Sequence, residues 1–374
     1  MKLTGISWQG YSLPFRRKYL TPGNQAMSRC GLLLFLKTDS GLVGVGEASP
    51  PGSGSLDEVR KITAILEGST SRLLGEDSEV VEETLSAWEI PASLRFGIET
   101  ALLDLKGQNR GVPVTVLLGG KPSTLAVNAL ITAESPEQVE LDARKAVGLG
   151  FTNLKLKVGR RTLSEDEHLV STVRRVVGPQ VKLRLDPNQA WNVNQAIESI
   201  RQLSRYQLEF VEQPVPAVDI TGLAKVRRSV PVAVAADESL SSLDDLHRLL
   251  DAGAADIFII KASRLGGLRA ALEVATEVIK ARQSVVVTTS LESGVGISAS
   301  THLATALPTQ SYAQGLATGL LFTQDLVYPA LAPTNGMFMT PDEPGLGVRV
   351  DTMLLREYGT AIMGSASSLS RLHE

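Results

Sequence analysis

The sequence predicts an α/β fold in which a barrel of eight parallel strands follows a smaller α+β unit. From residue 125 onward, short aliphatic runs alternate with amphipathic stretches of helical length, and the starts of the runs are 24 to 29 residues apart by subtraction. Strands and helices that alternate at such an interval form parallel βαβ units. Eight strands close a barrel. An open dinucleotide-binding sheet is disfavoured, because no GxGxxG follows any of the runs.

Residues 1 to 124 carry a different pattern. The segments ISWQGY, GLLLFLKTD and LVGVGEA are typical of strands in an antiparallel sheet. Helices are predicted after them, in SLDEVRKITAILEG, EVVEETLSAW and PASLRFGIETALLDLKGQNRG. The first third of the chain is therefore predicted to be an α+β unit in front of the barrel.

The predicted barrel strands follow in order along the chain. They are LAVNALIT from Leu125, TNLKLKV from Thr152, VKLRLD from Val181, LEFVEQ from Leu208, VAVAADE from Val232, DIFIIK from Asp256, SVVVTTS from Ser284 and SYAQGLA from Ser311. Intervening segments such as LDDLHRLLDAGAA and LRAALEVATEVIKARQ have apolar positions at helical spacing.

The composition is that of a soluble globular protein. Hydrophobic residues make up 43% and charged residues 21% of the chain, which is close to average. The net charge is −3 and there are no runs of like charge, so the charge pattern does not indicate binding to nucleic acid or to a membrane surface. Cys30 is the single cysteine, so an intrachain disulfide is excluded. Since the start lacks a signal-peptide core and no run approaches the ~18 apolar residues of a membrane span, we expect a cytoplasmic protein.

Three consecutive predicted strands end in an acid. These acids are Asp186 in RLDPNQ, Glu212 in FVEQP and Asp237 in AADES, and the C-terminal ends of barrel strands build the active site. A single such acid is usually a helix cap. Three in matching positions repel one another unless a cation lies among them, and a hard divalent ion prefers oxygen ligands. We therefore expect a site for Mg²⁺, with Mn²⁺ as a substitute.

Lysines are predicted on the same inner surface. In TNLKLKVG, Lys155 and Lys157 alternate with aliphatic residues, and successive strand side chains point to opposite faces. On an edge strand these lysines would only keep the surface soluble. In a barrel, helices cover the outer face, so the aliphatic residues belong there and the lysines point inward. Lys261 ends the sixth run, opposite the second in an eight-strand ring.

The lysines supply a candidate base. A partly desolvated lysine beside another ammonium has its pKa lowered toward the range of a working base. Lys157 is nearer the strand end and is the candidate, with Lys155 as its electrostatic neighbour. A metal flanked by lysines fits proton abstraction next to the carboxylate of a small-molecule substrate.

The motifs KLK, RLDPN, VEQP, ADES and IIK, in this order, resemble the enolase superfamily in its muconate-lactonizing subgroup. The resemblance implies that Asp186, Glu212 and Asp237 are the metal ligands and that Lys157 is the base. By the same resemblance, Lys261 would be the lysine that faces Lys157 from the opposite side of the barrel. It also implies a modified TIM barrel, (β/α)7β, at residues 125–330. An α+β capping domain at residues 1–124, completed by residues 331–374, would accompany it.

Three further stretches resemble the o-succinylbenzoate synthases of menaquinone and phylloquinone biosynthesis: LPFRRKYLTPGN, TTSLESGVGISASTHLA and GLATGLLFTQDL. That resemblance implies syn-dehydration of 2-succinyl-6-hydroxy-2,4-cyclohexadiene-1-carboxylate. Lys157 would remove the α-proton and then protonate the departing hydroxyl on the same face. Lys261 would stabilise the enediolate as a cation.

Other functions remain open. An N-acylamino acid racemase or a dipeptide epimerase on the same scaffold would use the two lysines from opposite faces. Dipeptide epimerases of this type bind the substrate ammonium with an Asp-x-Asp pair, whereas SYAQGLATG has no acid, and an unpaired buried ammonium is costly. A non-catalytic barrel with a structural ion-pair cluster is the remaining alternative. The sequence leaves the oligomeric state open.

Four residues are candidates for substrate binding. The helix start in SLESGVG offers backbone N–H groups to the succinyl carboxylate, which nominates Ser290, with Gly315 in GLATG on the other side. Strand-to-helix packing would require the same glycines. Arg184 shares the inward face of Asp186 and would orient Lys157 or balance the acids, and Asn188 is the fourth candidate. The PPGSGS loop at residues 50 to 55 could cover the barrel mouth or simply connect two elements.

Overall fold

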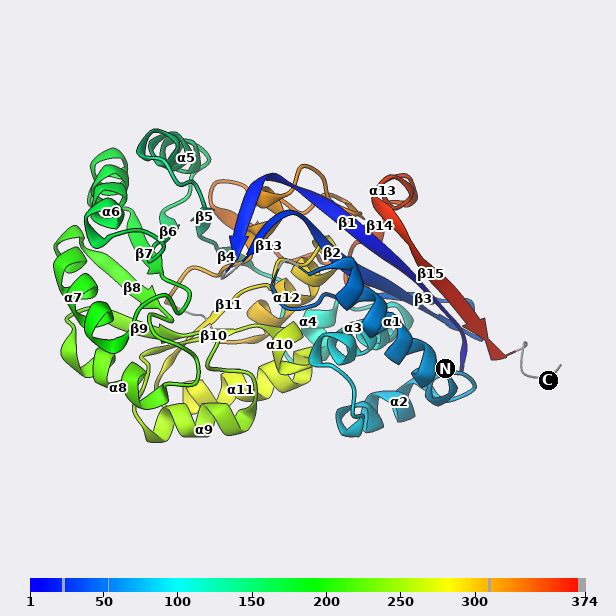
Figure 1. Ribbon diagram of the computed structural model, residues 1–374. Coiled ribbons are helices and arrows are strands. Elements are labelled where there is room, and N and C mark those ends of the chain that lie inside the picture. Colours follow the sequence, from blue (N-terminus) through cyan, green and yellow to red (C-terminus); the bar gives the residue numbers. More distant parts are fainter. Residues whose placement is uncertain (22–23, 53, 309–310, 369–374) are drawn as a thin grey trace.

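The computed structural model describes residues 1–21, 24–52, 54–308 and 311–368. Two bodies lie side by side in Figure 1, a barrel of strands ringed by helices and a cap built on an antiparallel sheet. The prediction of a modified barrel with an N-terminal α+β unit is confirmed. Among the described residues, no helix is long and apolar enough to cross a membrane.

The cap sheet has the strand order β15-β1-β2-β3. Its members are β1 (Leu3–Thr21), β2 (Asn24–Thr38), β3 (Val43–Ala48) and β15 (Gly359–Ser367). Strand β15 comes from the other end of the chain and pairs antiparallel with β1. The C-terminal region therefore contributes a strand to the N-terminal sheet, whereas the domain boundaries at residues 124 and 331 stay a prediction.

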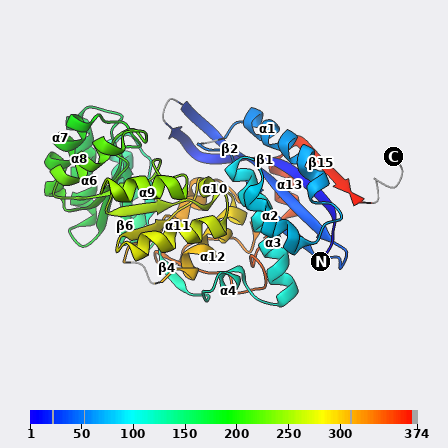
Figure 2. The same ribbon diagram turned by 90° about the horizontal axis from the view of Figure 1, so that it is seen from below.

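Alternation along β2 buries both faces of the cap sheet. Leu32, Leu34 and Leu36 belong to one hydrophobic cluster, which includes side chains of the cap helices, while Leu33 belongs to the cluster that continues into the barrel. Figures 1 and 2 show the cap helices against the sheet. They are α1 (Leu56–Ser69), α2 (Ser78–Thr84) and α3 (Ala92–Arg110), with short α4 (Val114–Leu117) after them and α13 (Thr352–Tyr358) beside β1.

Parallel strands form the barrel sheet, in the order β11-β10-β9-β8-β7-β6-β5. They are β5 (Ala129–Ile131), β6 (Asn153–Lys157), β7 (Lys182–Asp186), β8 (Leu208–Glu212), β9 (Ala233–Ala236), β10 (Ile257–Ile260) and β11 (Ser284–Val287). The predicted first run is split. Its beginning is β4 (Thr124–Ala126), which pairs with β13 (Met337–Met339), while β12 (Val327–Tyr328) pairs with β14 (Arg349–Val350).

The barrel helices follow their strands as predicted. They are α5 (Pro136–Gly148), α6 (Leu163–Val177), α7 (Val193–Leu203), α8 (Ile220–Ser229), α9 (Leu243–Asp251), α10 (Ala262–Leu265), α11 (Leu268–Lys280) and α12 (Gly294–Ala306). Local sequence fixes where several of them begin. In α6 a capping box pairs Thr162 with Glu165, and in α7 a second one pairs Asn192 with Gln195, which satisfies backbone N–H groups that a helix leaves free.

The eighth predicted run, SYAQGLA, closes the barrel without forming a regular strand. Gln314 bridges to Val127 on one edge of the sheet, and Gly315 bridges to Thr288 on the other. The Gln314 N–H donates to Ala126 O (2.7 Å) and the Gly315 N–H to Val287 O (2.8 Å). Two residues thus connect both edges, and the 3-10 helix η4 (Ala317–Leu321) follows at once.

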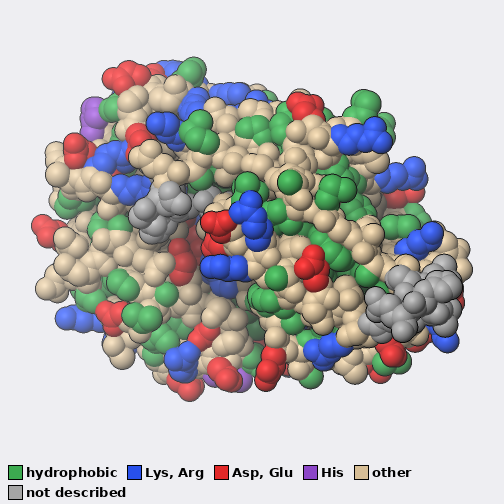
Figure 3. Space-filling model, turned by 45° about the vertical axis from the view of Figure 1, so that its right-hand side comes forward, with side chains coloured by type: hydrophobic (Ala, Val, Ile, Leu, Met, Phe, Trp, Pro, Cys, Tyr) green, Lys and Arg blue, Asp and Glu red, His purple; other side chains and the backbone are tan. Residues whose placement is uncertain are grey.

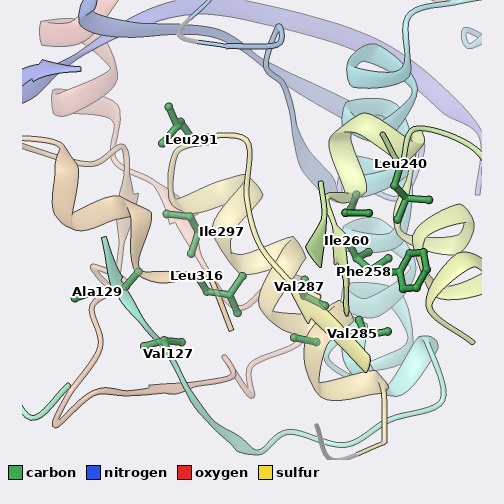
Figure 4. Close-up of a cluster of buried hydrophobic side chains, with 14 of the residues drawn as sticks. Val127, Ala129, Leu240, Phe258, Ile260, Val285, Val287, Leu291, Ile297 and Leu316 are labelled. Carbon is green, nitrogen blue, oxygen red and sulfur yellow. The ribbon is translucent and has the colours of Figure 1, made fainter. Parts of the chain in front are cut away.

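The barrel strands have an apolar outer face and a mixed inner face. Leu154, Leu156 and Val158 pack into the large outer cluster, which confirms the orientation predicted from TNLKLKVG. Figure 4 shows part of this cluster, with side chains of β10 and β11 packed together. Inside the barrel, a small cluster that includes Phe210 and Ile259 fills the floor. Above this floor, the inward side chains at the strand ends include Lys157, Asp186 and Glu212, which line a cavity.

Candidate active site

The three strand-end acids and the three lysines line one cavity of about 510 Å³ between barrel and cap. The acid side chains of Asp186, Glu212 and Asp237 are at most 3% exposed. Figure 3 shows acidic and basic side chains next to one another around a hollow on that face of the molecule. The convergence predicted from strand register is therefore present in the structure.

Each lysine is bonded to an acid. Lys157 Nζ donates to Asp186 Oδ2 (2.7 Å), and Lys261 Nζ donates to Asp237 Oδ2 (2.6 Å). Lys155 Nζ lies 2.7 Å from Glu212 Oε1 and 3.0 Å from Asp186 Oδ2. Lys155 thus bridges two acids. This contact goes beyond the predicted role of Lys155 as the electrostatic neighbour of Lys157.

The prediction of a lowered lysine pKa is wrong for the protein in this arrangement. Burial lowers the pKa of Lys157, but the opposing effects of Asp186 and Tyr19 together outweigh it, so the pKa is raised from its ordinary value. The pKa of Lys155 is also raised, because the charges of nearby acids that include Asp186 and Glu212 outweigh the effect of burial. Sequence spacing showed that the lysines were together, but it did not show that their ammonium groups bond to the acids.

Glu212 is the least acidic member of the group. Burial raises its pKa to about 7, and the carboxylates of Asp186 and Asp237 add to the increase against the opposing effect of Lys155. The pKa values of Asp186 and Asp237 are lowered, because lysine and arginine side chains outweigh the effect of burial. Mutual repulsion among the three acids is the feature from which a cation site was predicted.

The donor set fits a hard divalent cation. Among the described residues, no three His, Cys, Asp or Glu side chains are arranged so that they could hold a metal ion as they stand. Lysine ammonium groups are bonded to the three acids. Three buried carboxylates on one wall nevertheless offer only oxygen donors, which Mg²⁺ and Mn²⁺ accept. Glu238 Oε2 on the same wall is buried and has no hydrogen-bond partner within the described part of the chain, so this wall has acceptor capacity to spare.

Asn188 links Lys157, the candidate base, to a second acid. Its Oδ1 accepts a hydrogen bond from Lys157 Nζ, and its Nδ2 donates to Glu238 Oε1 (2.8 Å). The Asn188 backbone is left-handed, with φ of 47°, a conformation that asparagine tolerates better than most residues. Asn188 therefore contacts Lys157 in this structure, and its contact with substrate stays a prediction.

Two site residues were missed by the sequence reasoning. Arg264 Nη1 donates to both Asp237 Oδ1 and Asp237 O, each at 2.7 Å. Its place three residues after Lys261, at the start of a helix, was the available signal. Glu238 could have been suspected because it directly follows Asp237.

The assignment of Arg184 to substrate binding is wrong. Its Nε donates to Glu209 Oε2 (2.6 Å), its Nη1 donates to Ala313 O (2.8 Å), and its guanidinium lies 4.6 Å from the centre of the Phe210 ring. Arg184 points inward as predicted but lies one layer below Asp186, and it is not among the residues that line the cavity. It holds the barrel floor together.

The helix start in SLESGVG does bind an anion, but that anion belongs to the cap. The N–H groups of Ser293 and Gly296 donate to the two oxygens of Glu47, each at 2.9 Å. Glu47 is fully buried and comes from β3. The prediction that these groups hold the succinyl carboxylate is therefore wrong. Ser290 does line the cavity, where its Oγ lies 3.0 Å from Ser263 Oγ.

Gly315 has a packing reason to be glycine. A Cβ at this position would lie 2.3 Å from Thr288 Oγ1, closer than atoms can approach. The Gly315 carbonyl also accepts a hydrogen bond from the Thr288 hydroxyl (2.8 Å). Gly315 lines the cavity as well, so packing accounts for the glycine while contact with substrate stays a prediction.

The cap supplies one side of the cavity through Tyr19, Ser49, Pro51 and Gly52. Part of the predicted loop at residues 50 to 55 thus lies at the barrel mouth, although Ser53 falls outside the described residues. A smaller cavity of about 160 Å³ shares Tyr19, Leu130 and Ala317 with the first.

Comparison with known protein families finds matches to both bodies. A model of the enolase C-terminal domain-like family matches residues 138–354, and a model of the mandelate racemase / muconate lactonizing enzyme N-terminal domain matches residues 22–119.

Similar proteins differ in their reactions. An o-succinylbenzoate synthase from Thermobifida fusca is 44% identical over 216 residues, which cover 57% of this chain and 66% of that protein. An L-Ala-D/L-Glu epimerase from Clostridium acetobutylicum is 31% identical over 346 residues, covering 90% of this chain and 96% of the relative.

The similar solved structures also belong to enzymes with different reactions. A muconate lactonizing enzyme from Pseudomonas fluorescens complexed with muconolactone superposes with a TM-score of 0.91 at 26% identity, over 96% of this chain and 99% of that one. The N-succinyl Arg/Lys racemase from Bacillus cereus superposes with a TM-score of 0.89 at 25% identity, over 98% of this chain and 100% of that one.

Proposed function

The chain belongs to the enolase superfamily, and from that premise we propose that it is an o-succinylbenzoate synthase of menaquinone or phylloquinone biosynthesis. The substrate is 2-succinyl-6-hydroxy-2,4-cyclohexadiene-1-carboxylate, which loses water. Support comes from the 44% identical synthase and from a cavity in which lysines and acids meet. Superfamily membership also supports an enzyme over a non-catalytic barrel.

The acids provide the cation site in this proposal. Asp186, Glu212 and Asp237 would hold Mg²⁺, or Mn²⁺ in its place, because they are buried oxygen donors on one wall. When bound, the cation supplies the positive charge that lowers the cost of removing a proton next to a carboxylate.

Lys157 moves the protons. As the free amine, its Nζ takes the α-proton of the substrate and then gives a proton to the hydroxyl that leaves from the same face. Asn188 Oδ1 and Asp186 Oδ2 hold Nζ in place. Because Asp186 raises the pKa of Lys157, the ammonium must be freed from this carboxylate before it can act as a base.

Lys261 acts as a fixed positive charge from another wall. Its Nζ is bonded to Asp237, and Arg264 is bonded to the same carboxylate. Two cations around one acid leave positive charge for a substrate oxygen that gains negative charge. In a dehydration, Lys261 transfers no proton.

The composition of one cavity wall argues against a dipeptide substrate. Among the described residues that line the cavity, the wall between Thr288 and Thr318 presents hydroxyl groups and small or aliphatic side chains, with no carboxylate. A substrate ammonium on this wall would be desolvated without a partner. A substrate without an ammonium group, such as the succinyl cyclohexadiene, meets no such cost.

An N-acylamino acid racemase is the second candidate. Lys157 and Lys261 both line the same cavity, as two-base proton transfer requires, and N-acylation removes the substrate ammonium. The N-succinyl Arg/Lys racemase among the similar structures supports this alternative.

The proposal is tested by incubating the purified protein and Mg²⁺ with the cyclohexadiene carboxylate and following formation of the aromatic product. We expect saturable turnover that chelator abolishes and added Mg²⁺ restores. No turnover by metal-loaded, folded protein would refute the synthase assignment.

A further inference from the structure

A buried arginine of the cap joins two loops of the cavity. Arg29 lies on β2 and its side chain is inaccessible to solvent. Its Nη2 donates to Pro50 O (2.7 Å), its Nη1 to Gly52 O (2.6 Å) and its Nε to Leu291 O (3.0 Å). Three different nitrogens of one guanidinium are thus bonded to backbone carbonyls, two in the cap and one in the barrel.

Both of these loops form part of the cavity wall. Pro51 and Gly52 line the cavity from the cap, and Ser290 and Leu291 line it from the segment between β11 and α12. Arg29 itself does not line the cavity. It lies behind the wall, at the junction of the two loops.

The backbone of both loops is held in left-handed conformations. Leu291 has φ of 68° and Gly52 has φ of 70°. For a residue with a large side chain such a conformation persists only where the surroundings enforce it. The hydrogen bond from Arg29 Nε to the Leu291 carbonyl is one of the contacts that do so.

The space around the guanidinium is closely filled. A Cβ at Gly54 would lie 2.6 Å from Cys30 O and 3.1 Å from Arg29 Nη1. The cap loop therefore packs directly over the guanidinium. Lysine, with one compact ammonium group in place of a planar fork, cannot reach all three carbonyls in the same geometry.

We propose that Arg29 is a positioning residue that sets the cavity wall formed by Pro51, Gly52 and Leu291, and with it the affinity for substrate. Arg29 makes no contact with the acids or lysines at the strand ends, so it acts on binding of substrate and not on the proton transfer. The inference rests on the proposed function only in that this cavity binds the substrate.

Arg174 offers a matched control elsewhere in the barrel. Its Nε donates to Tyr206 O (2.9 Å) and its Nη1 to Gly178 O (2.6 Å) and Val181 O (2.8 Å). It too joins loops through backbone carbonyls, but neither it nor its partners line the cavity. Arg174→Met therefore removes a comparable set of hydrogen bonds without touching the proposed wall.

The test compares full-length Arg29→Met, Arg29→Lys and Arg174→Met with the unaltered protein. For Arg29→Met we expect KM to rise roughly tenfold while kcat stays within about threefold, as when binding common to ground state and transition state is lost. Arg29→Lys should recover part of the lost affinity, and Arg174→Met should leave KM unchanged. If Arg29→Met does not fold, Arg29→Lys carries the comparison, with a smaller rise in KM.

Amide hydrogen exchange gives a second readout that needs no substrate. In either Arg29 variant, exchange should accelerate together in peptides covering residues 50–55 and 288–293, and in Arg174→Met it should accelerate only near residues 178–181 and 206–207. Unchanged exchange in one of the two cavity loops would overturn the proposal even if no substrate were turned over. An equal rise of KM in Arg29→Met and Arg174→Met would also overturn it.

Discussion

Lys157 Nζ donates a hydrogen bond to Asp186 Oδ2 at 2.7 Å, so the candidate base is bonded directly to a candidate metal ligand. The same oxygen lies 3.0 Å from Lys155 Nζ. A cation that binds Asp186 must therefore compete with two ammonium groups. Binding of the metal and release of the base are coupled through this one carboxylate.

Replacing Lys157 by alanine should lower kcat by about a thousandfold or more, since a positioned general base contributes about 10² to 10⁴ in rate. Steady-state kinetics of the metal-loaded variant measure the loss. Lys182→Ala is the control, because Lys182 is exposed at the opposite end of a neighbouring strand and should retain full activity. Substantial turnover by folded Lys157→Ala would show that another group is the base.

Replacing Lys261 by arginine should separate the two candidate reactions. The guanidinium keeps the positive charge near Asp237 but does not give up a proton at neutral pH. Dehydration should therefore fall only modestly, by about tenfold, whereas two-base racemisation should be lost. Both activities are measured on the same preparation. Retained racemisation in this variant would show that Lys261 is not the second base of the alternative reaction.

Replacing Lys155 by methionine should make stability depend on Mg²⁺. Loss of the ammonium leaves Glu212 and Asp186 buried with less compensation, which should destabilise the metal-free protein by about 3 kcal/mol or more. Mg²⁺ should reverse this effect, because it supplies the missing positive charge. Thermal denaturation with and without Mg²⁺ measures it. Lys145→Met, on α5, is the control, and equal Mg²⁺ responses in both variants would argue against a cation at these acids.

The buried carboxylate of Glu99 should make the stability of the protein depend on pH. Its carboxylate accepts hydrogen bonds from the N–H groups of Leu268 and Arg269 at the start of α11, and burial raises its pKa from 4.5 to about 7. Since the folded state holds the proton more tightly, this group lowers stability as pH rises from about 4.5 to about 7, by up to about 3 kcal/mol.

Glu99→Gln removes that titration, so its stability relative to the unaltered protein should improve between pH 5 and pH 7. Urea unfolding at several pH values measures the difference. Glu83→Gln, at an exposed position on α2, should leave the pH dependence unchanged. A constant difference between Glu99→Gln and the unaltered protein across this range would refute the assignment.

The barrel and its strand ends could be predicted because both follow from local pattern. Alternation in TNLKLKVG fixes which side chains point inward, and parallel register brings Asp186, Glu212 and Asp237 to one end. The sequence could not show in which layer of the barrel interior an inward side chain lies. Arg184 shares the face of Asp186 but lies one layer lower, bonded to Glu209, and strand periodicity does not distinguish the layers.

Contacts between the cap and the barrel were the other part that could not be predicted. Glu47 reaches the start of α12, 246 residues away from Ser293 in the chain, and no local signal marks that pairing. The helix start in SLESGVG therefore resembled an open anion site. Arg29 was missed for the same reason, because its partner Leu291 is 262 residues away.

In the proposed function, this cavity dehydrates the cyclohexadiene carboxylate in preference to racemising an acylated amino acid. The most direct measurement is an internal competition in D₂O, with the metal-loaded protein and equal concentrations of the cyclohexadiene carboxylate and an N-succinyl amino acid. The ratio of kcat/KM follows from product formed and deuterium incorporated in one reaction. We predict that dehydration is faster by about tenfold or more. Faster deuterium incorporation into the amino acid, with little or no dehydration, would show that the protein is not primarily a synthase.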